Sequence, residues 1–120
     1  MMFDWSEYLS LANEMVQRPE EAAKRAAVSR AYYSVFCRAR NWLEIQGIPI
    51  GHNNSDHNTV WTAFERLQGK SAKRIGQEGK RLRRARNMVD YDNTVDKLSS
   101  TVRSAMEHAK TIHTELQHML

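Results

Sequence analysis

Apolar side chains recur along most of the chain at the three- and four-residue steps of an α-helix, and no stretch alternates with polar positions as a strand would. The clearest pattern is the last one, where these steps continue over more than three heptads. It predicts a long final helix, with Asp92 or Asn93 as its N-cap. The apolar positions of this helix are Val95, Leu98, Val102, Ala105, Ala109, Ile112, Leu116 and Met119.

A proline separates the first two helices. The first is predicted over residues 5–16, with Asp4 or Ser6 as its cap, because apolar residues follow the same steps there. It has to end before Pro19, since the residue that precedes a proline avoids helical geometry. Pro19 itself fits the first turn of the second helix, which is predicted to run to about Gln46.

A loop and two further helices are predicted in the middle of the chain. Residues 50–56 are expected to form the loop. The third helix should end at Gly69, and Ser71 is a suitable cap for the fourth. Two glycines inside the fourth helix, Gly76 and Gly79, each cost about 1 kcal/mol relative to alanine, so they weaken its first half.

Length and composition limit the protein to a small all-α fold. The chain has 120 residues, of which 41% are hydrophobic and 27% are charged, enough for one packed domain over residues 1–120. Its one cysteine, Cys37, has no partner for a disulfide within the chain, which favours a reducing compartment. No apolar stretch reaches the roughly 20 residues that cross a bilayer. We expect an up-and-down bundle of four or five helices, in the cytoplasm and not in a membrane.

Positive charge is concentrated between residues 70 and 86. This segment has eight lysines and arginines and one acid, Glu78, whereas the whole chain has a net charge of +4. Two interpretations are open: a surface for a polyanion such as RNA or a nucleotide, or a solvated helix face whose long side chains cover apolar neighbours. The candidate nucleic-acid-binding residues are Lys73, Arg74, Lys80, Arg81, Arg83 and Arg84.

Two arginines fall on apolar helix faces. Arg86 continues the apolar positions of the fourth helix, and Asp90 follows it by one helical turn. Arg30 follows a run of alanines on the second helix. Because a buried arginine needs a carboxylate partner or a cavity, we expect Arg30, Arg86 and Asp90 to form a polar cluster inside or at the edge of the bundle. The cluster is either a functional site or an ion pair that fixes the packing.

Two stretches of the sequence resemble the signatures of small prokaryotic HEPN-domain proteins. The first is SRAYYSVF at residues 29–36, similar to the family pattern S-R-A-Y-Y-A-x-F on the second helix. The second is RNMVDYD at residues 86–92, similar to R-x-x-A-D-Y-D near the end of the fourth helix. His57 matches a histidine that is often found before the third helix in that branch. The resemblance covers about residues 22–92 and implies a helical bundle of the HEPN type.

The resemblance also implies a protein that acts on or near RNA. HEPN domains commonly form homodimers, many are metal-independent endoribonucleases, and others belong to toxin–antitoxin or phage-defence systems beside a nucleotidyltransferase partner. In such a ribonuclease an arginine stabilises transition-state charge and a histidine moves protons. By this comparison Arg86 is the candidate for contact with the phosphate. Asp90 and Tyr91 would have an orienting role in the site, and His57 would be a substitute proton donor.

The chain departs from the ribonuclease pattern where the family has its histidine. That histidine follows the arginine after four to six residues, where this chain has Tyr91, Asp92 and Asn93. A phenol is a poor general base at neutral pH. Three functions are therefore open. The first is an RNA-directed effector, either a toxin-like ribonuclease or a degenerate relative. The second is a non-catalytic module that binds RNA, a nucleotide or a nucleotidyltransferase, and the third is a dimerising structural protein without a ligand. For His57 the alternative role is a cap of the third helix or a side chain in solvent.

No cofactor and no metal site is predicted. His108, His113 and His118 are spaced by five residues, so they do not share one face of a helix. The glycines of the chain do not form a phosphate-binding loop with the lysine that such a loop requires.

Overall fold

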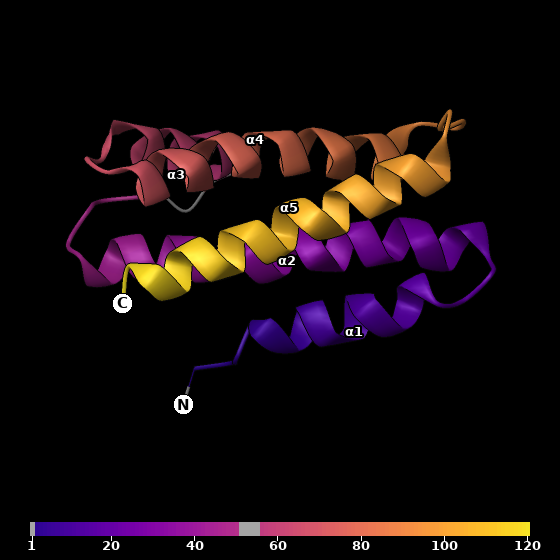
Figure 1. Cartoon of the computed structure of the whole chain (residues 1–120), viewed down its shortest axis with the longest axis horizontal. Coiled ribbons are helices and arrows are strands. Elements are labelled where there is room, and N and C mark those ends of the chain that lie inside the picture. The colour runs from indigo at the N-terminus through magenta and orange to yellow at the C-terminus, as the bar shows by residue number, and fades with distance from the viewer. Residues whose placement is uncertain (1, 51–55) are drawn as a thin grey trace.

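The chain folds into five α-helices, seen in a computed structural model that describes residues 2–50 and 56–120. They are α1 (Ser6–Val16), α2 (Glu21–Ile45), α3 (Asp56–Arg66), α4 (Lys70–Tyr91) and α5 (Leu98–His118). Four of them, α1, α2, α4 and α5, run up and down along the molecule, and the short α3 lies beside α4 (Figure 1). This arrangement confirms the predicted all-α bundle. No helix in the described part of the chain is long and apolar enough to cross a membrane.

The central element of the bundle is α2, which packs against α1, α4 and α5. Fully buried alanines, among them Ala27, Ala31 and Ala39, let these neighbours approach its backbone closely. Large side chains fill the remaining space, including Tyr32 of α2 and Trp61 of α3, and neither of these is exposed to solvent. The core is thus built around α2, in agreement with its content of alanine and aromatic residues.

The short helix α3 lies so close to α4 that two positions of α4 have no room for a side chain. A Cβ atom on Gly79 would lie 2.2 Å from the ring of Trp61, and one on Gly76 would lie 2.6 Å from the Trp61 carbonyl oxygen. Of the two glycines that weaken α4 as an isolated helix, Gly79 admits the indole of Trp61 into the core and Gly76 admits the backbone of α3. They also hold α3, which is too short to be stable by itself.

The start of α1 and the end of α2 lie close to their predicted positions, but Trp5, and not Asp4 or Ser6, is the N-cap residue of α1. At the start of α1, the backbone N–H of Ser6 donates to Oδ1 of Asp4 at 3.0 Å. Two residues beyond the end of α2, Gly47 has a φ of +79°, which lets the N–H of Ile48 donate to the carbonyl of Leu43 at 3.0 Å. This is the Schellman arrangement, in which a glycine adopts the left-handed conformation without a Cβ clash.

Two other helix starts differ from the prediction. α2 begins two residues after Pro19. Ser71 lies in the first turn of α4, because Gly69, with a φ of +104°, turns the chain and takes the N-cap position. Within the predicted loop at 50–56, residues 51–55 lie outside the described part of the chain, and Asp56 is the first residue of α3.

The prediction for the start of the final helix is wrong. α5 begins at Leu98, after Lys97 in the left-handed conformation, so neither Asp92 nor Asn93 is its cap. The backbone carbonyls of Asp92 and Asn93 instead accept hydrogen bonds from the guanidinium of Arg25 on α2. These bonds fix the segment that follows α4. The apolar positions of the sequence pattern therefore begin at Val95, before the first residue of α5, Leu98.

Candidate functional site

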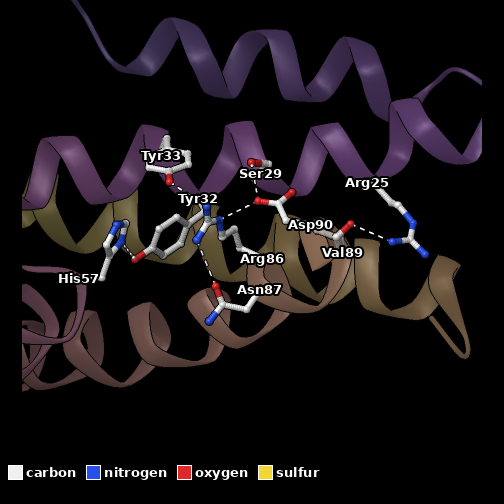
Figure 2. A network of polar contacts seen from close by, with 9 residues as sticks. All are labelled: Arg25, Ser29, Tyr32, Tyr33, His57, Arg86, Asn87, Val89 and Asp90. Atoms are coloured by element: carbon white, nitrogen blue, oxygen red, sulfur yellow. Dashed lines mark hydrogen bonds and ion pairs between the residues drawn. The ribbon is translucent and has the colours of Figure 1, made fainter. Parts of the chain in front are cut away.

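The guanidinium of Arg86 lies where α2 and α4 meet, and side chains of both helices hold it (Figure 2). Its Nη2 donates a hydrogen bond to the hydroxyl of Tyr33 at 2.9 Å, and its Nη1 donates to Oδ1 of Asn87 at 3.1 Å. Its Nε lies 2.8 Å from Oδ2 of Asp90, an ion pair in which the N–H does not point at the oxygen. Only 15% of the Arg86 side chain is exposed, so the guanidinium is held in one orientation at the edge of the bundle.

Asp90 supplies the counter-charge of Arg86. It lies one turn further along α4, so the helix itself sets the spacing of the pair, as the sequence predicts. Ser29 of α2 donates a hydrogen bond to Oδ2 of Asp90 at 3.3 Å (Figure 2). Since 25% of the Asp90 side chain is exposed, an anion from solvent can compete with it for Arg86.

Two aromatic rings complete the surroundings of Arg86. The guanidinium carbon lies 5.2 Å from the ring centroid of Tyr33 and 5.6 Å from that of Tyr91, within the range of cation–π attraction. Tyr91 is 73% exposed, so one ring of this site is open to a ligand. We name Arg86 and the four side chains that surround it, Tyr33, Asn87, Asp90 and Tyr91, the Arg86 cluster.

His57 lies beside this cluster, in a corner built from aromatic rings. Its imidazole stacks on Phe36, with ring centroids 4.2 Å apart and planes at 17°. Its Nδ1 lies 2.7 Å from the hydroxyl oxygen of Tyr32, to which the indole N–H of Trp61 also donates, at 3.1 Å. The alternative of a side chain in solvent is therefore wrong for His57.

The ring of Tyr33 joins the two parts of the site. The His57 ring centroid lies 6.0 Å from the Tyr33 ring, and the hydroxyl of the same ring accepts the hydrogen bond from Arg86. The structure thus brings together three of the four candidate catalytic residues, Arg86, Asp90 and Tyr91. The fourth, His57, lies against the ring of Tyr33, which Arg86 also contacts. Side chains that the sequence analysis did not single out hold them in place, and these are Ser29, Tyr32, Tyr33, Trp61 and Asn87.

The hydroxyl of Tyr32 is a neutral group in the core. Burial raises its pKa well above the usual value, and the hydrogen bond from Trp61 and the positive charges of Arg83 and Arg86 offset only part of that effect. The phenol therefore keeps its proton at neutral pH. It can donate one hydrogen bond and accept others at the same time.

Arg30 is not part of the cluster, so this part of the prediction is wrong. Its side chain is exposed, and its guanidinium carbon lies 5.2 Å from the ring centroid of Tyr8 on α1. Successive residues of a helix are rotated by about 100°, so Ser29 and Tyr33, one turn apart, face α4 while Arg30 faces α1. Ser29 takes the place beside Asp90 that was expected for Arg30.

The cations of α4 do not form one uniform surface. Lys73 donates to the backbone carbonyls of Glu65 and Leu67 at the end of α3, at 3.3 and 3.1 Å, and Lys80 pairs with the Glu65 carboxylate. Arg81 lies 3.4 Å from Glu78, and Arg74 lies 3.6 Å from Glu115 of α5. These four predicted contacts for RNA thus have partners on this chain.

The other two predicted nucleic-acid-binding cations are Arg83 and Arg84. Neither Arg83 nor Arg84 forms an ion pair with any residue that the structure describes. Arg84 is exposed, whereas Arg83 is partly buried on the side of α4 near Tyr32, whose pKa it influences. Arg83 precedes Arg86 by about one helical turn, so it lies on the same side of α4, whereas Arg84 is rotated away from Arg86 by about 200°. Of the six predicted nucleic-acid-binding cations, Arg83 is therefore the one that can extend a polyanion surface from the Arg86 cluster.

Arg25 is a structural residue that the sequence analysis missed. Its Nη1 donates to the backbone carbonyl of Val89 at 2.9 Å (Figure 2) and to that of Asp92 at 2.7 Å, and its Nε pairs with Glu21 at 2.9 Å. It binds carbonyls that the end of α4 leaves without partners within the helix. In this way Arg25 fixes the place at which α4 ends, and with it the position of Tyr91.

A second polar cluster lies between α2 and α5. The imidazole of His113 has its Nε2 2.9 Å from the hydroxyl of Ser34, and the guanidinium of Arg38 donates to its Nδ1. Burial, together with the positive charge of Arg38, lowers the pKa of His113 to about 4, so the ring is neutral at pH 7.

Among residues 2–50 and 56–120, no three His, Cys, Asp or Glu side chains are placed to hold a metal ion.

Comparison with known proteins adds no relative. No model of a protein family matches the chain, and searches of curated proteins and of solved structures find no match either. The HEPN resemblance therefore rests on residues 29–36, His57 and residues 86–92. The function has to be argued from the geometry of the site.

Proposed function

We propose that the chain is a HEPN-like, RNA-directed protein in which the Arg86 cluster binds a phosphodiester group. The observation that carries this proposal is the fixed guanidinium of Arg86, which is paired with an exposed carboxylate that an anion can displace. An arginine held in this way matches the geometry of phosphate oxygens. The exposed ring of Tyr91 beside it supports a stacked base, and Arg83, one turn before Arg86 on α4, supports a further contact with the nucleic-acid backbone.

Binding without cleavage is the form of this function that we favour, as a degenerate relative of the ribonucleases. Tyr91 stands at the first of the positions where the ribonuclease pattern has its histidine. The nearby imidazole, that of His57, has its Nδ1 engaged by the hydroxyl of Tyr32. The same site then serves a non-catalytic module for RNA or a nucleotide.

A metal-independent endoribonuclease is the second candidate. It is favoured by the proximity of Arg86 and His57 to the same ring, that of Tyr33. In such a reaction the 2′-oxygen of RNA gives its proton to water and attacks the phosphorus. The bond to the 5′-oxygen then breaks, that oxygen takes up a proton, and a 2′,3′-cyclic phosphate remains. Arg86 would stabilise the charge on the phosphorane.

Incubation of the purified protein with labelled structured RNAs, in EDTA and 0.15 M salt, separates the two candidates. We expect the RNA to stay intact and to bind. Arg86→Lys should weaken binding about tenfold or more, because it keeps the charge but loses the fork of donors. Arg84→Gln is the matched control on the same helix and should mainly lower the salt dependence of binding.

Each remaining outcome has a definite meaning. A cyclic phosphate product made by the parent protein and not by Arg86→Lys would establish the ribonuclease. No binding at 0.15 M salt, with circular dichroism showing folded protein, would refute the proposal. Equal losses for Arg86→Lys and Arg84→Gln would refute a specific role of Arg86.

Partners and location belong to the same proposal. The HEPN resemblance supports a homodimer that acts in the cytoplasm, beside a nucleotidyltransferase in a toxin–antitoxin or phage-defence system. Sedimentation at several protein concentrations tests the dimer directly. A monomer at every concentration would remove that part of the proposal and leave the RNA site of the single chain intact.

A further inference from the structure

The hydroxyl of Tyr32 stands between two nitrogen atoms and has one proton to donate. On one side the indole N–H of Trp61, which can only donate, lies 3.1 Å from the oxygen. On the other side Nδ1 of His57 lies at 2.7 Å. Within the described part of the chain, no other acceptor lies within hydrogen-bond distance of this hydroxyl.

We propose that Tyr32 donates its hydroxyl proton to Nδ1 of His57 and thereby holds the imidazole in the tautomer that carries its proton on Nε2. The reverse arrangement, in which Nδ1–H donates to the oxygen, would leave a fully buried O–H without an acceptor. That loss favours the Nε2–H tautomer by about tenfold or more. Tyr32 is in this sense a positioning residue for His57.

The packing around His57 keeps the ring in the orientation that this hydrogen bond needs. The imidazole stacks on Phe36 and lies nearly parallel to Tyr32, with interplanar angles of 17° and 20°. Trp61 is fixed in turn, because its ring fills the space left by Gly79. Packing and hydrogen bonds therefore fix all three side chains, from Trp61 in the core through Tyr32 to His57.

The consequence is that His57 does not serve as the base of a cleavage reaction, because Tyr32 engages Nδ1 and the proton stays on Nε2. A nitrogen that already carries a proton cannot accept the one that the 2′-hydroxyl of RNA must lose. This consequence rests on the proposed function, whereas the tautomer itself does not.

The tautomer can be measured without any RNA. A two-bond ¹H–¹⁵N correlation spectrum of ¹⁵N-labelled protein at pH 7.5 shows which imidazole nitrogen carries the proton, and a His57→Gln variant assigns the signals. We expect a protonated Nε2 and an unprotonated Nδ1 for His57. A protonated Nδ1 in the parent protein would overturn the proposal, whether or not the protein binds RNA.

Two adjacent tyrosines provide matched variants for the role of the hydroxyl. Tyr32→Phe removes the donor to Nδ1 but keeps the ring, so the two tautomers of His57 should become mixed. Tyr33→Phe removes the hydroxyl that accepts from Arg86, so RNA binding should weaken while the His57 pattern stays unchanged. An unchanged His57 pattern in Tyr32→Phe would refute Tyr32 as the positioning residue. If Tyr32→Phe does not fold, the spectrum of the parent protein decides.

Discussion

On one side of α2, the Arg86 cluster pairs a guanidinium with a carboxylate and leaves the ring of Tyr91 in solvent. On another side of α2, Arg38 and Ser34 contact His113 of α5, a ring that is largely buried and neutral. The Arg86 cluster lies beside a histidine, His57, and the second cluster contains one, His113; both clusters include hydroxyl groups. They differ in whether a charged pair is open to solvent.

This difference separates a site that can exchange partners from one that only fixes packing. In the Arg86 cluster, an incoming anion can replace Asp90 without leaving a buried charge unpaired. In the His113 cluster, Ser34 and Arg38 each contact one ring nitrogen of His113. Removing any one of these side chains would leave a buried polar atom without a hydrogen-bond partner. Arginine and histidine near one another are therefore weak signs of function until exposure and pairing are known.

The largest expected effect tests the contact that holds the His57 side of the molecule. Gly79→Ala places a Cβ atom 2.2 Å from the Trp61 ring, so α3 has to shift away from α4. We expect a loss of about 3 kcal/mol in the free energy of unfolding, measured by urea denaturation. Gln77→Ala on the exposed face of α4 is the control and should change stability by less than about 0.5 kcal/mol. Equal stability of the two variants would show that α3 is not held by this contact.

The next effect sharpens the contrast through pH. The pKa of His113 falls to about 4 in the folded protein, below its ordinary value, so the unfolded chain takes up the proton first as the pH falls. Above about pH 6.5, the buried neutral ring of His113 makes its full contribution to the free energy of unfolding. This contribution decreases by about 2 to 3 kcal/mol as the pH falls to 4.

Urea denaturation at several pH values measures this decrease. In His113→Gln the step between pH 6.5 and pH 4 should be much smaller, because the titrating ring is absent. His118→Gln, which changes an exposed histidine near the end of α5, should keep the step. A step of the same size in His113→Gln would assign it to other groups.

The smallest effect concerns the exchange of anions at Arg86. Asp90→Asn removes the charge that competes with a phosphodiester, and so it should raise the affinity for RNA about threefold to tenfold. Fluorescence anisotropy at 0.15 M salt measures the change. Asp92→Asn, an exposed acid beyond the end of α4, is the control. Weaker binding by Asp90→Asn would mean that Asp90 orients Arg86 for the ligand and does not compete with it.

Much of the site within one helix could be predicted from the sequence. Arg86 and Asp90 are four residues apart, so any helix through both positions brings them together. The contacts between helices could not be predicted in this way. Tyr33 reaches Arg86, and Arg25 reaches the end of α4, only because α2 and α4 pack in one particular register.

The sequence by itself determined the all-α class and the approximate bounds of most helices, because apolar periodicity and glycine and proline breaks act over a few residues. The tertiary structure decided which neighbour each helix face meets. Because of this packing, Arg30 contacts the ring of Tyr8 and Lys80 forms an ion pair with Glu65. It also places the Tyr32 hydroxyl between Trp61 and His57. Periodicity gives the direction of a side chain around its own axis, but the depth and register of packing depend on the shapes of all the helices together.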